Sequence, residues 1–296
     1  MCADLASSAS QPRALVVGGT GMIGRYMMRH LAARGIQPVG LVRSPPAGED
    51  GWIAGDVRTP QAWAAQMPPC DLVLATAELH LVVPAIETFA HNGVRRLVAI
   101  STTSLLTKRD SVIDAERDKL ARIAAAETQL AADCERLGIG WTILRPTLIY
   151  DEGRDINVSR LANLIRRFGF IPLAGSGKGL RQPVHAEDLA TGAIDAAHSA
   201  AAINKAYVVP GGDTLSYRDM VGRIFEGLGR RRMIVAVPAS LWRLAFRLAQ
   251  PLFPNANFAM GDRMSMDMVF DAGPAQRDFG WRPRGFRPRF PETMKP

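Results

Sequence analysis

The sequence predicts an α/β fold in which a doubly wound parallel sheet is followed by a smaller C-terminal lobe. Two observations support this prediction. Short apolar runs typical of buried strands alternate with helical patterns from residue 13 to residue 150. A glycine-rich turn joins the first strand, residues 14–17, to the first helix. With 296 residues, the chain can bury a sizeable core as one large domain or as a domain with a smaller lobe.

The glycine-rich turn spaces Gly18, Gly21 and Gly24 three residues apart. Gly18 allows a sharp turn off the strand, Gly21 lets a pyrophosphate approach the backbone, and Gly24 lets the helix pack closely on the sheet. The helix start then offers unpaired N–H groups and a positive dipole end to phosphates. We therefore expect a Rossmann sheet with a dinucleotide bound at Gly18, Thr20, Gly21, Met22, Ile23 and Gly24.

The second strand, residues 36–42, ends at Arg43. In a dinucleotide fold the adenosine ribose lies at this strand end. An acidic residue there binds the 2′-OH of NAD, whereas an arginine accommodates the 2′-phosphate of NADP. Arg43 therefore predicts NADP, with NAD less favoured. The alternative is an ordinary surface arginine that ends a strand.

Three further strands are predicted at residues 52–57, 71–76 and 96–100. Their ends add five expected cofactor-binding residues: Asp56, Val57, Ala75, Thr76 and Ser101. Asp56 would hydrogen-bond the adenine amino group or cap the helix that starts near Pro60. Helices are predicted at residues 81–92 and 114–137, and a sixth strand at residues 141–144.

Several of these motifs resemble the extended and atypical short-chain dehydrogenases/reductases, in particular the NAD(P)-dependent epimerase/dehydratase group. They are the glycine pattern, Gly55-Asp56, the Ser-Thr run from residue 101, Trp-Thr-Ile-Leu-Arg-Pro-Thr at residues 141–147, and Arg-x-x-x-His-x-x-Asp-hydrophobic-Ala at residues 181–190. The resemblance covers roughly residues 13–212 and implies an NAD(P) cofactor, with Pro146 among its contacts. The resemblance predicts the cofactor more firmly than the substrate, because proteins of this fold catalyse many different reactions.

The expected organisation is a flexible leader at residues 1–12 and an NAD(P)-binding Rossmann domain at residues 13–150, to which residues 181–212 return. Residues 151–180 and 213–296 would form the substrate lobe. Residues 241–249 form an amphipathic pattern with two arginines, which would contact a membrane surface or pack on the lobe.

The helix predicted at residues 114–137 differs from the family at the positions of the catalytic side chains. Its members with the usual chemistry carry Tyr-x-x-x-Lys there, and the lysine lowers the pKa of the tyrosine so that it can move a proton. The family pattern ends Lys-x-x-x-Glu. Matching that glutamate to Glu127 places Ile123 at the lysine position and Lys119 at the tyrosine position. The resemblance therefore implies that the pair is absent, and no tyrosine occurs between Tyr26 and Tyr150.

Two catalytic candidates remain. Thr103 matches the family's hydroxyl after the fifth strand, and it would contact substrate or serve as a turn hydroxyl. Lys119 would replace the lost acid or base if it were desolvated, since burial lowers the pKa of an ammonium group. Its alternative is an ion pair with Glu116 on an exposed helix face.

Three polar residues near the expected site have other roles to test. Glu127 would tie its helix to a neighbouring backbone group or act as a buried acid. His185 is expected to be a structural hydrogen-bonding residue rather than a base. The resemblance places Arg181 near an anionic substrate.

Composition limits the partners. The net charge of +8 comes from scattered basic residues, which favours an anionic cofactor and a small-molecule substrate over nucleic acid. The three cysteines and five histidines show no metal-ligand spacing, so no metal is predicted, and the cysteines favour a reducing, cytoplasmic location. No apolar run approaches the roughly 20 residues that span a bilayer, so we expect no stable membrane insertion. A homodimer is left open.

These observations are compatible with two alternative functions. The first is an oxidoreductase or epimerase/dehydratase of divergent mechanism, acting on a small anionic or nucleotide-sugar-like substrate. The second is a non-catalytic NADP(H)-binding sensor or assembly subunit. The missing Tyr–Lys pair favours the second, while the retained substrate-lobe motifs favour the first. We favour the enzyme.

Overall fold

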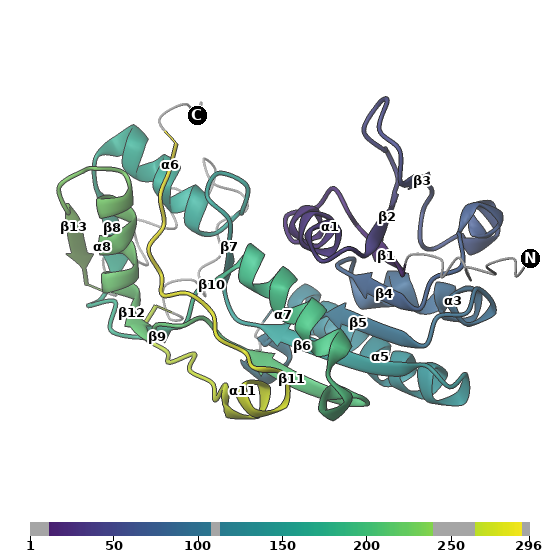
Figure 1. Ribbon diagram of the computed structural model, residues 1–296. Helices are drawn as coiled ribbons and strands as arrows, with labels where there is room; N and C mark the ends of the chain where they lie inside the picture. The colour runs from purple at the N-terminus through teal and green to yellow at the C-terminus, as the bar shows by residue number, and fades with distance from the viewer. Residues whose placement is uncertain (1–11, 108–112, 239–263, 292–296) are drawn as a thin grey trace, which may run out of the picture. The chain divides into compact units, whose positions relative to one another are not determined.

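The computed structural model describes residues 12–107, 113–238 and 264–291 (Figure 1). The chain divides into two compact units. The first unit comprises Met1–Ser101, Ile113–Ile143 and Ala193–Ala206, and the second comprises Thr102–Val112, Leu144–Gly192 and Tyr207–Pro296. The predicted leader up to residue 11 and the amphipathic pattern at residues 241–249 lie outside the described residues.

A seven-stranded sheet has the order β11–β6–β5–β4–β1–β2–β3. Its strands are β1 (Arg13–Val17), β2 (Gln37–Val42), β3 (Trp52–Ala54), β4 (Leu72–Ala75), β5 (Arg96–Ile100), β6 (Gly140–Pro146) and β11 (Lys205–Val209). The four pairs from β3 to β5 are parallel. The strand order reverses between β1 and β4, which creates the switch point where such sheets bind ligands. The predicted doubly wound Rossmann sheet is confirmed.

The first unit contains α1 (Gly24–Ala33), α2 (Leu79–Val82), α3 (Ile86–His91) and the long α5 (Asp114–Arg136). Helix α1 buries Met27 and Leu31. The single helix predicted over residues 81–92 is wrong, because the 3₁₀ turn η3 (Val83–Ala85) separates α2 from α3. Pro84 lies inside that turn and has no N–H to continue an α-helical ladder. Further 3₁₀ turns are η1 (Pro60–Ala62), η2 (Ala64–Gln66) and η4 (Ala200–Ala202).

The second unit is built from short ladders and two packed helices. Its elements are α4 (Ser104–Thr107), β7 (Ile149–Tyr150), α6 (Val158–Phe168), β8 (Ile171–Ala174), β9 (Leu180–Arg181), β10 (Val184–His185), β12 (Leu215–Ser216), α8 (Tyr217–Gly227), β13 (Ile234–Val237) and α11 (Gly273–Phe279). Helix α7 (Ala186–His198) begins in the second unit and ends in the first. Buried residues of α6 and α8, among them Ile165 and Phe225, form one core with β8.

Ser216 caps α8, because its hydroxyl accepts a hydrogen bond from the Asp219 N–H at 3.0 Å. In the part of the chain that the structure describes, no helix is both long enough and apolar enough to cross a bilayer.

Candidate functional site

The first candidate site is the turn between β1 and α1. Gly18 has φ +84°, a left-handed conformation that glycine adopts without a steric penalty. Its N–H donates to the Leu41 carbonyl at 2.9 Å, and the Gly21 N–H donates to the Gly18 carbonyl at 2.9 Å. A Cβ added at Gly24 would lie only 2.1 Å from the Gly18 oxygen. Gly24 therefore permits close packing against the backbone of the turn itself.

The turn offers backbone donors for a phosphate. Among the described residues, the N–H groups of Met22 and Ile23 find no acceptor within the protein. Unpaired N–H groups at a helix start bind phosphates well. A Cβ at Gly21 would lie 3.0 Å from the Gly18 oxygen, so the loop is already closely packed there. Its residues fit a dinucleotide pyrophosphate.

Thr76 fastens the end of β4 to this turn. Its hydroxyl donates to the Val17 carbonyl at 2.9 Å and lies 3.3 Å from the Gly18 carbonyl. Ala75 is the register partner of Val17. The structure therefore brings Gly18, Ala75 and Thr76 together at the switch point, with the Thr76 hydroxyl already engaged in holding the turn.

Asp56 lies in a cluster with two arginines. Its carboxylate accepts hydrogen bonds from the Arg58 guanidinium at 2.6 and 3.0 Å and from the Arg58 N–H at 3.0 Å. The Arg58 side chain, the Arg58 backbone and the positive charge of Arg43 lower the pKa of Asp56 to about 2. The cap predicted for the helix near Pro60 is absent, since Thr59 holds that position without a side-chain bond. Adjacent Val57 is buried.

Ser101 and Glu127 join β5 to α5. The Ser101 hydroxyl donates to Glu127 Oε1 at 2.5 Å, and Glu127 is only 7% exposed. Of the two roles expected for Glu127, a tie to a backbone group or a buried acid, neither is decided by this bond, which joins its carboxylate to a side-chain hydroxyl. Ser101 thus lies at the carboxyl end of β5, and its hydroxyl donates to Glu127.

Lys119 lies in an exposed ion pair. Its Nζ donates to Glu78 Oε1 at 2.8 Å, and the two side chains are 53% and 47% exposed. The partner that the structure gives is therefore Glu78, where the sequence suggested Glu116. The desolvation that a catalytic role requires is missing. Ile123, one turn further along α5, is buried and has no group that could bind a ribose.

In the second unit, Thr103 is engaged with Pro146. The Thr103 hydroxyl donates to the Pro146 carbonyl at 2.9 Å, and the Thr103 N–H donates to the same oxygen at 3.1 Å. Thr103 is buried. These bonds correspond to the turn-hydroxyl alternative and use the proton that a substrate contact would need.

Arg181 is buried in the lobe. Its guanidinium donates to the carbonyls of Leu180 and Met266, both at 2.7 Å, and lies 5.6 Å from the centre of the Tyr217 ring. Burial lowers the pKa of Arg181 and raises the pKa of Tyr217. A desolvated guanidinium attracts an anion strongly.

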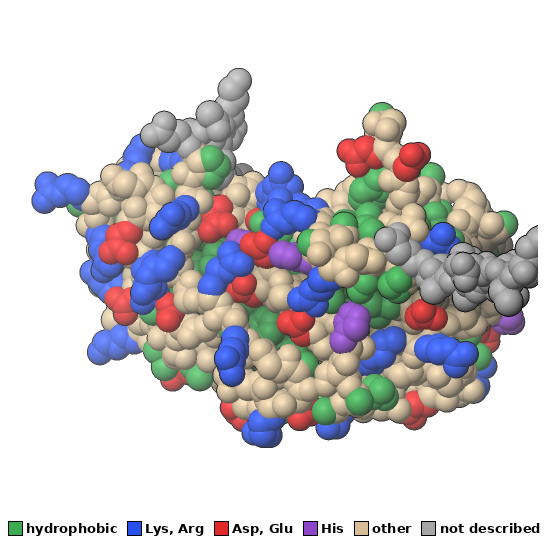
Figure 2. All heavy atoms as spheres, viewed as in Figure 1, with side chains coloured by type: hydrophobic (Ala, Val, Ile, Leu, Met, Phe, Trp, Pro, Cys, Tyr) green, Lys and Arg blue, Asp and Glu red, His purple; other side chains and the backbone are tan. Residues whose placement is uncertain are grey.

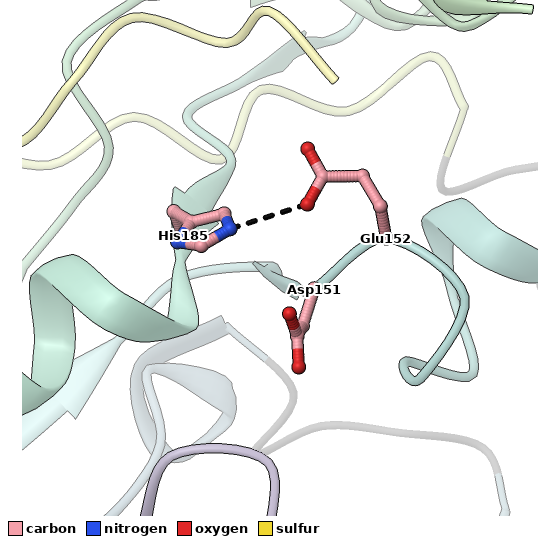
Figure 3. A group of neighbouring side chains, drawn as sticks. All are labelled: Asp151, Glu152 and His185. Carbon is pink, nitrogen blue, oxygen red and sulfur yellow. Dashed lines mark hydrogen bonds and ion pairs between the residues drawn. The ribbon is translucent and has the colours of Figure 1, made fainter. Parts of the chain in front are cut away.

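Asp151, Glu152 and His185 form the cluster drawn in Figure 3, with one candidate ligand atom from each within 4.8 Å of the others. The Glu187 N–H donates to His185 Nδ1 at 3.1 Å. In a neutral ring the proton then lies on Nε2, which donates to Glu152 Oε2 at 3.2 Å. A metal would need a lone pair on that nitrogen, so the arrangement does not fit a metal ion. The predicted structural role of His185 has a partner, Glu152, that sequence reasoning missed.

Comparisons with known proteins agree with this geometry. Residues 18–168 match the model of a family described as NAD(P)H-binding. A 2-alkyl-3-oxoalkanoate reductase of Stenotrophomonas maltophilia is 26% identical over 316 residues, which covers 91% of this chain and 94% of the relative. The mitochondrial NADH dehydrogenase (ubiquinone) 1 alpha subcomplex subunit 9 of Arabidopsis thaliana is 26% identical over 260 residues, or 78% of this chain and 62% of that protein.

Solved structures share the fold. A dTDP-glucose 4,6-dehydratase of Streptomyces venezuelae with NAD bound has a TM-score of 0.67 at 19% identity and covers 92% of each chain. The expected resemblance to the extended short-chain dehydrogenases/reductases is confirmed.

Proposed function

The chain belongs to the NAD(P)H-binding family and resembles the extended short-chain dehydrogenases/reductases, and we propose that it is an NADP(H)-dependent oxidoreductase. Its substrate would be a small anionic carbonyl compound. The observation that carries the cofactor assignment is that Arg43 follows β2 beside the end of β3, where Arg58 pairs with Asp56. The redox chemistry itself would come from the nicotinamide, which donates a hydride when bound.

The two arginines favour a phosphorylated ribose. Arg43 directly follows β2, where an acidic residue would instead bind the 2′-OH of NAD. Arg58 holds the nearby Asp56 carboxylate, so the negative charge of Asp56 is largely compensated. A 2′-phosphate would meet net positive charge here and form charge-assisted hydrogen bonds.

Support for an anionic carbonyl substrate comes from two sources. Arg181 is a buried guanidinium in the lobe. The bacterial relative that covers most of this chain is named for a substrate with both a carboxylate and a ketone, 2-alkyl-3-oxoalkanoate. The proposal extends that chemical class, rather than that compound, to this chain.

The proposed reaction lacks the usual proton donor. Ile123 stands where the family lysine would be, Lys119 is ion-paired in solvent, and the Thr103 proton is engaged. A positioned general acid accelerates such steps by about 10²–10⁴-fold. We therefore expect turnover to be slower by about this factor than in a relative that retains the pair.

Cofactor titration tests the proposal directly. We expect NADPH to bind at least about tenfold more tightly than NADH, and Arg43→Ala to remove most of that preference while leaving NADH binding unchanged. Arg95→Ala, an exposed arginine elsewhere in the first unit, is the matched control. Equal affinity of the unaltered protein for the two cofactors would contradict the NADP assignment.

The second candidate is a non-catalytic NADP(H)-binding subunit. The buried Ile123 and the similarity to a subunit of a mitochondrial NADH dehydrogenase favour it. A panel of 3-oxo acids and nucleotide sugars, followed at the nicotinamide absorbance band, separates the two functions. Tight NADPH binding without turnover of any compound would select the subunit.

A further inference from the structure

Two glycines of the first unit are not explained by their backbone conformation. Gly19 lies in the β1–α1 turn, and Gly40 lies inside β2. Neither has the left-handed conformation that favours glycine. A glycine inside a strand weakens the strand and often marks a place where another group comes close to the backbone. We therefore looked for a group that a side chain at either position would displace.

That group is the indole of Trp52, the first residue of β3 and the register partner of Gly40. A Cβ added at Gly40 would lie 2.4 Å from both Cε3 and Cζ3 of the indole. A Cβ added at Gly19 would lie 2.9 Å from the same Cζ3. One edge of the ring therefore lies directly against the backbone of both glycines and fills the space that their missing side chains leave.

Other contacts hold the ring in this position. The Trp52 Nε1 donates to Glu49 Oε2 at 3.3 Å, and the Gly40 N–H donates to the Gly51 carbonyl at 2.8 Å, which pairs the two strands beside the ring. Trp52 is half-buried. Figure 2 shows acidic side chains on the connection between β2 and β3 and hydrophobic side chains at its base. Moving the ring away from Gly19 would disturb both the strand pairing and the bond to Glu49.

The cofactor turn is thus supported on two sides. On the side of β4, the Thr76 hydroxyl oxygen lies 2.5 Å from the position that a Cβ on Gly18 would take. On the side of β2 and β3, Trp52 lies against Gly19, and the Gly18 N–H donates to the Leu41 carbonyl. The backbone of the turn has little room to shift toward either neighbouring strand.

We propose that Trp52 is a positioning residue for the bound dinucleotide and acts through Gly19 on the turn. The inference rests on the proposed binding of the cofactor pyrophosphate at this turn. A turn that adopts its binding arrangement only part of the time binds with a proportionally lower apparent affinity. Because NADPH and NADH share the pyrophosphate, the ring raises the affinity for both, whereas Arg43 distinguishes between them.

Calorimetric titration of Trp52→Ala with both cofactors tests the proposal. If the turn without the ring is in its binding arrangement about a tenth of the time, both affinities fall about tenfold and their ratio stays the same. Trp141→Ala is the matched control. Trp141 is also half-buried in the first unit, and its Nε1 also donates to a glutamate, Glu135, at 3.1 Å. This control should leave both affinities unchanged.

A double-variant cycle tests whether Trp52 acts through Gly19. Gly19→Ala alone places a methyl group against the ring and should weaken NADPH binding about fivefold. In the Trp52→Ala background the same substitution should cost less than about twofold. The next atoms, Gly40 Cα and Met28 Sδ, would both lie 3.4 Å from the added Cβ. Such a departure from additivity is expected of two residues in contact.

The readouts separate positioning from a general structural role. A tryptophan that only stabilised β3 would lower the temperature of thermal unfolding, and the effect of Gly19→Ala on NADPH affinity would not depend on residue 52. Unchanged affinity in folded Trp52→Ala would overturn the proposal. Additive losses in the cycle would also overturn it, in favour of a direct contact between the ring and the cofactor.

Two further outcomes are covered. If Trp52→Ala does not fold, Trp52→Phe takes its place in the cycle, since phenylalanine lacks the second ring that meets both glycines. If the unaltered protein binds neither cofactor, the proposed function fails together with this inference. Binding of NADPH with additive losses rejects only the role of Trp52.

Discussion

The β1–α1 turn and helix α5 belong to the same unit but match the family pattern to different extents. The turn keeps all three glycines, the left-handed Gly18 and the hydroxyl of Thr76 that fastens it. Helix α5 contains no tyrosine, and the resemblance assigns Ile123 to the position of the family lysine. The turn acts through backbone groups, whereas the family's proton transfer depends on two particular side chains. Cofactor binding would therefore tolerate side-chain substitutions that the family's proton transfer would not.

The strongest test of this contrast is Gly24→Ala. Its Cβ would meet the Gly18 carbonyl, which is backbone and cannot move aside as a side-chain tip can. We expect NADPH affinity to fall by about a hundredfold or more, because the misplaced turn can no longer hold the pyrophosphate. Calorimetric titration measures the loss.

Gly140→Ala is the control for Gly24→Ala, since the nearest atom to its Cβ would be the Ile203 Cγ2 methyl at 3.2 Å, and the nearest backbone atom, the Arg95 oxygen, would lie at 3.6 Å. If Gly24→Ala bound NADPH as well as Gly140→Ala does, the turn would not be the binding element.

The second test concerns the arginine that sequence analysis did not select. Arg58→Ala should weaken NADPH binding by about tenfold and NADH binding much less, because one charge-assisted contact to the 2′-phosphate would be lost. Fluorescence titration of both cofactors measures the ratio. An equal loss for both cofactors would instead assign Arg58 to holding Asp56 in place.

The third test concerns the hydrogen bond between Ser101, after β5, and Glu127 on α5. Ser101→Ala removes a donor from the buried Glu127 carboxylate and should lower the free energy of unfolding by about 1–3 kcal/mol. Urea denaturation measures the change. Glu127→Gln in the same Ser101→Ala background should recover part of the loss, since a neutral amide is less costly to bury. No loss in Ser101→Ala would show that this bond is unimportant.

The fourth test asks whether α5 retains any catalytic group. Lys119→Met should change turnover by no more than about twofold, as expected of an exposed ion pair. Steady-state rates across pH provide the readout. A hundredfold loss with a changed pH profile would restore Lys119 as an acid or base.

The smallest effect is expected from acid. The folded-state pKa of Asp56 is lowered from 3.8 to about 2, mainly by Arg58. The stabilisation is therefore present above about pH 4 and is lost as the pH falls through about 2. The difference in stability between the unaltered protein and Asp56→Asn should be constant from neutral pH to about pH 5 and shrink at lower pH. A difference that already shrinks near neutral pH would contradict this origin.

Sequence reasoning succeeded where the structure depends on local backbone requirements. The glycines after β1 and the Ser216 cap both follow from short-range rules and were predictable. The contact of Arg58 with Asp56 could also have been predicted, because the two residues are only two positions apart in the sequence.

The missed contacts join residues that are far apart in the chain. Lys119 and Glu78 are 41 residues apart, and His185 and Glu152 are 33 residues apart. No spacing rule pairs such residues, because their distance depends on how separate elements pack. The division of the predicted helix at residues 81–92 shows a different failure, since the helical pattern was given more weight than Pro84.

The assignment of residues to the two units has a consequence for folding and for the protein's history. The chain changes unit inside β6, inside α7 and again inside β11, so neither unit is one continuous piece of sequence. A fragment ending near residue 150 would lack β11 at the edge of the sheet and leave β6 with an open edge. Neither unit could therefore be released by a single proteolytic cut or gained by a simple gene fusion.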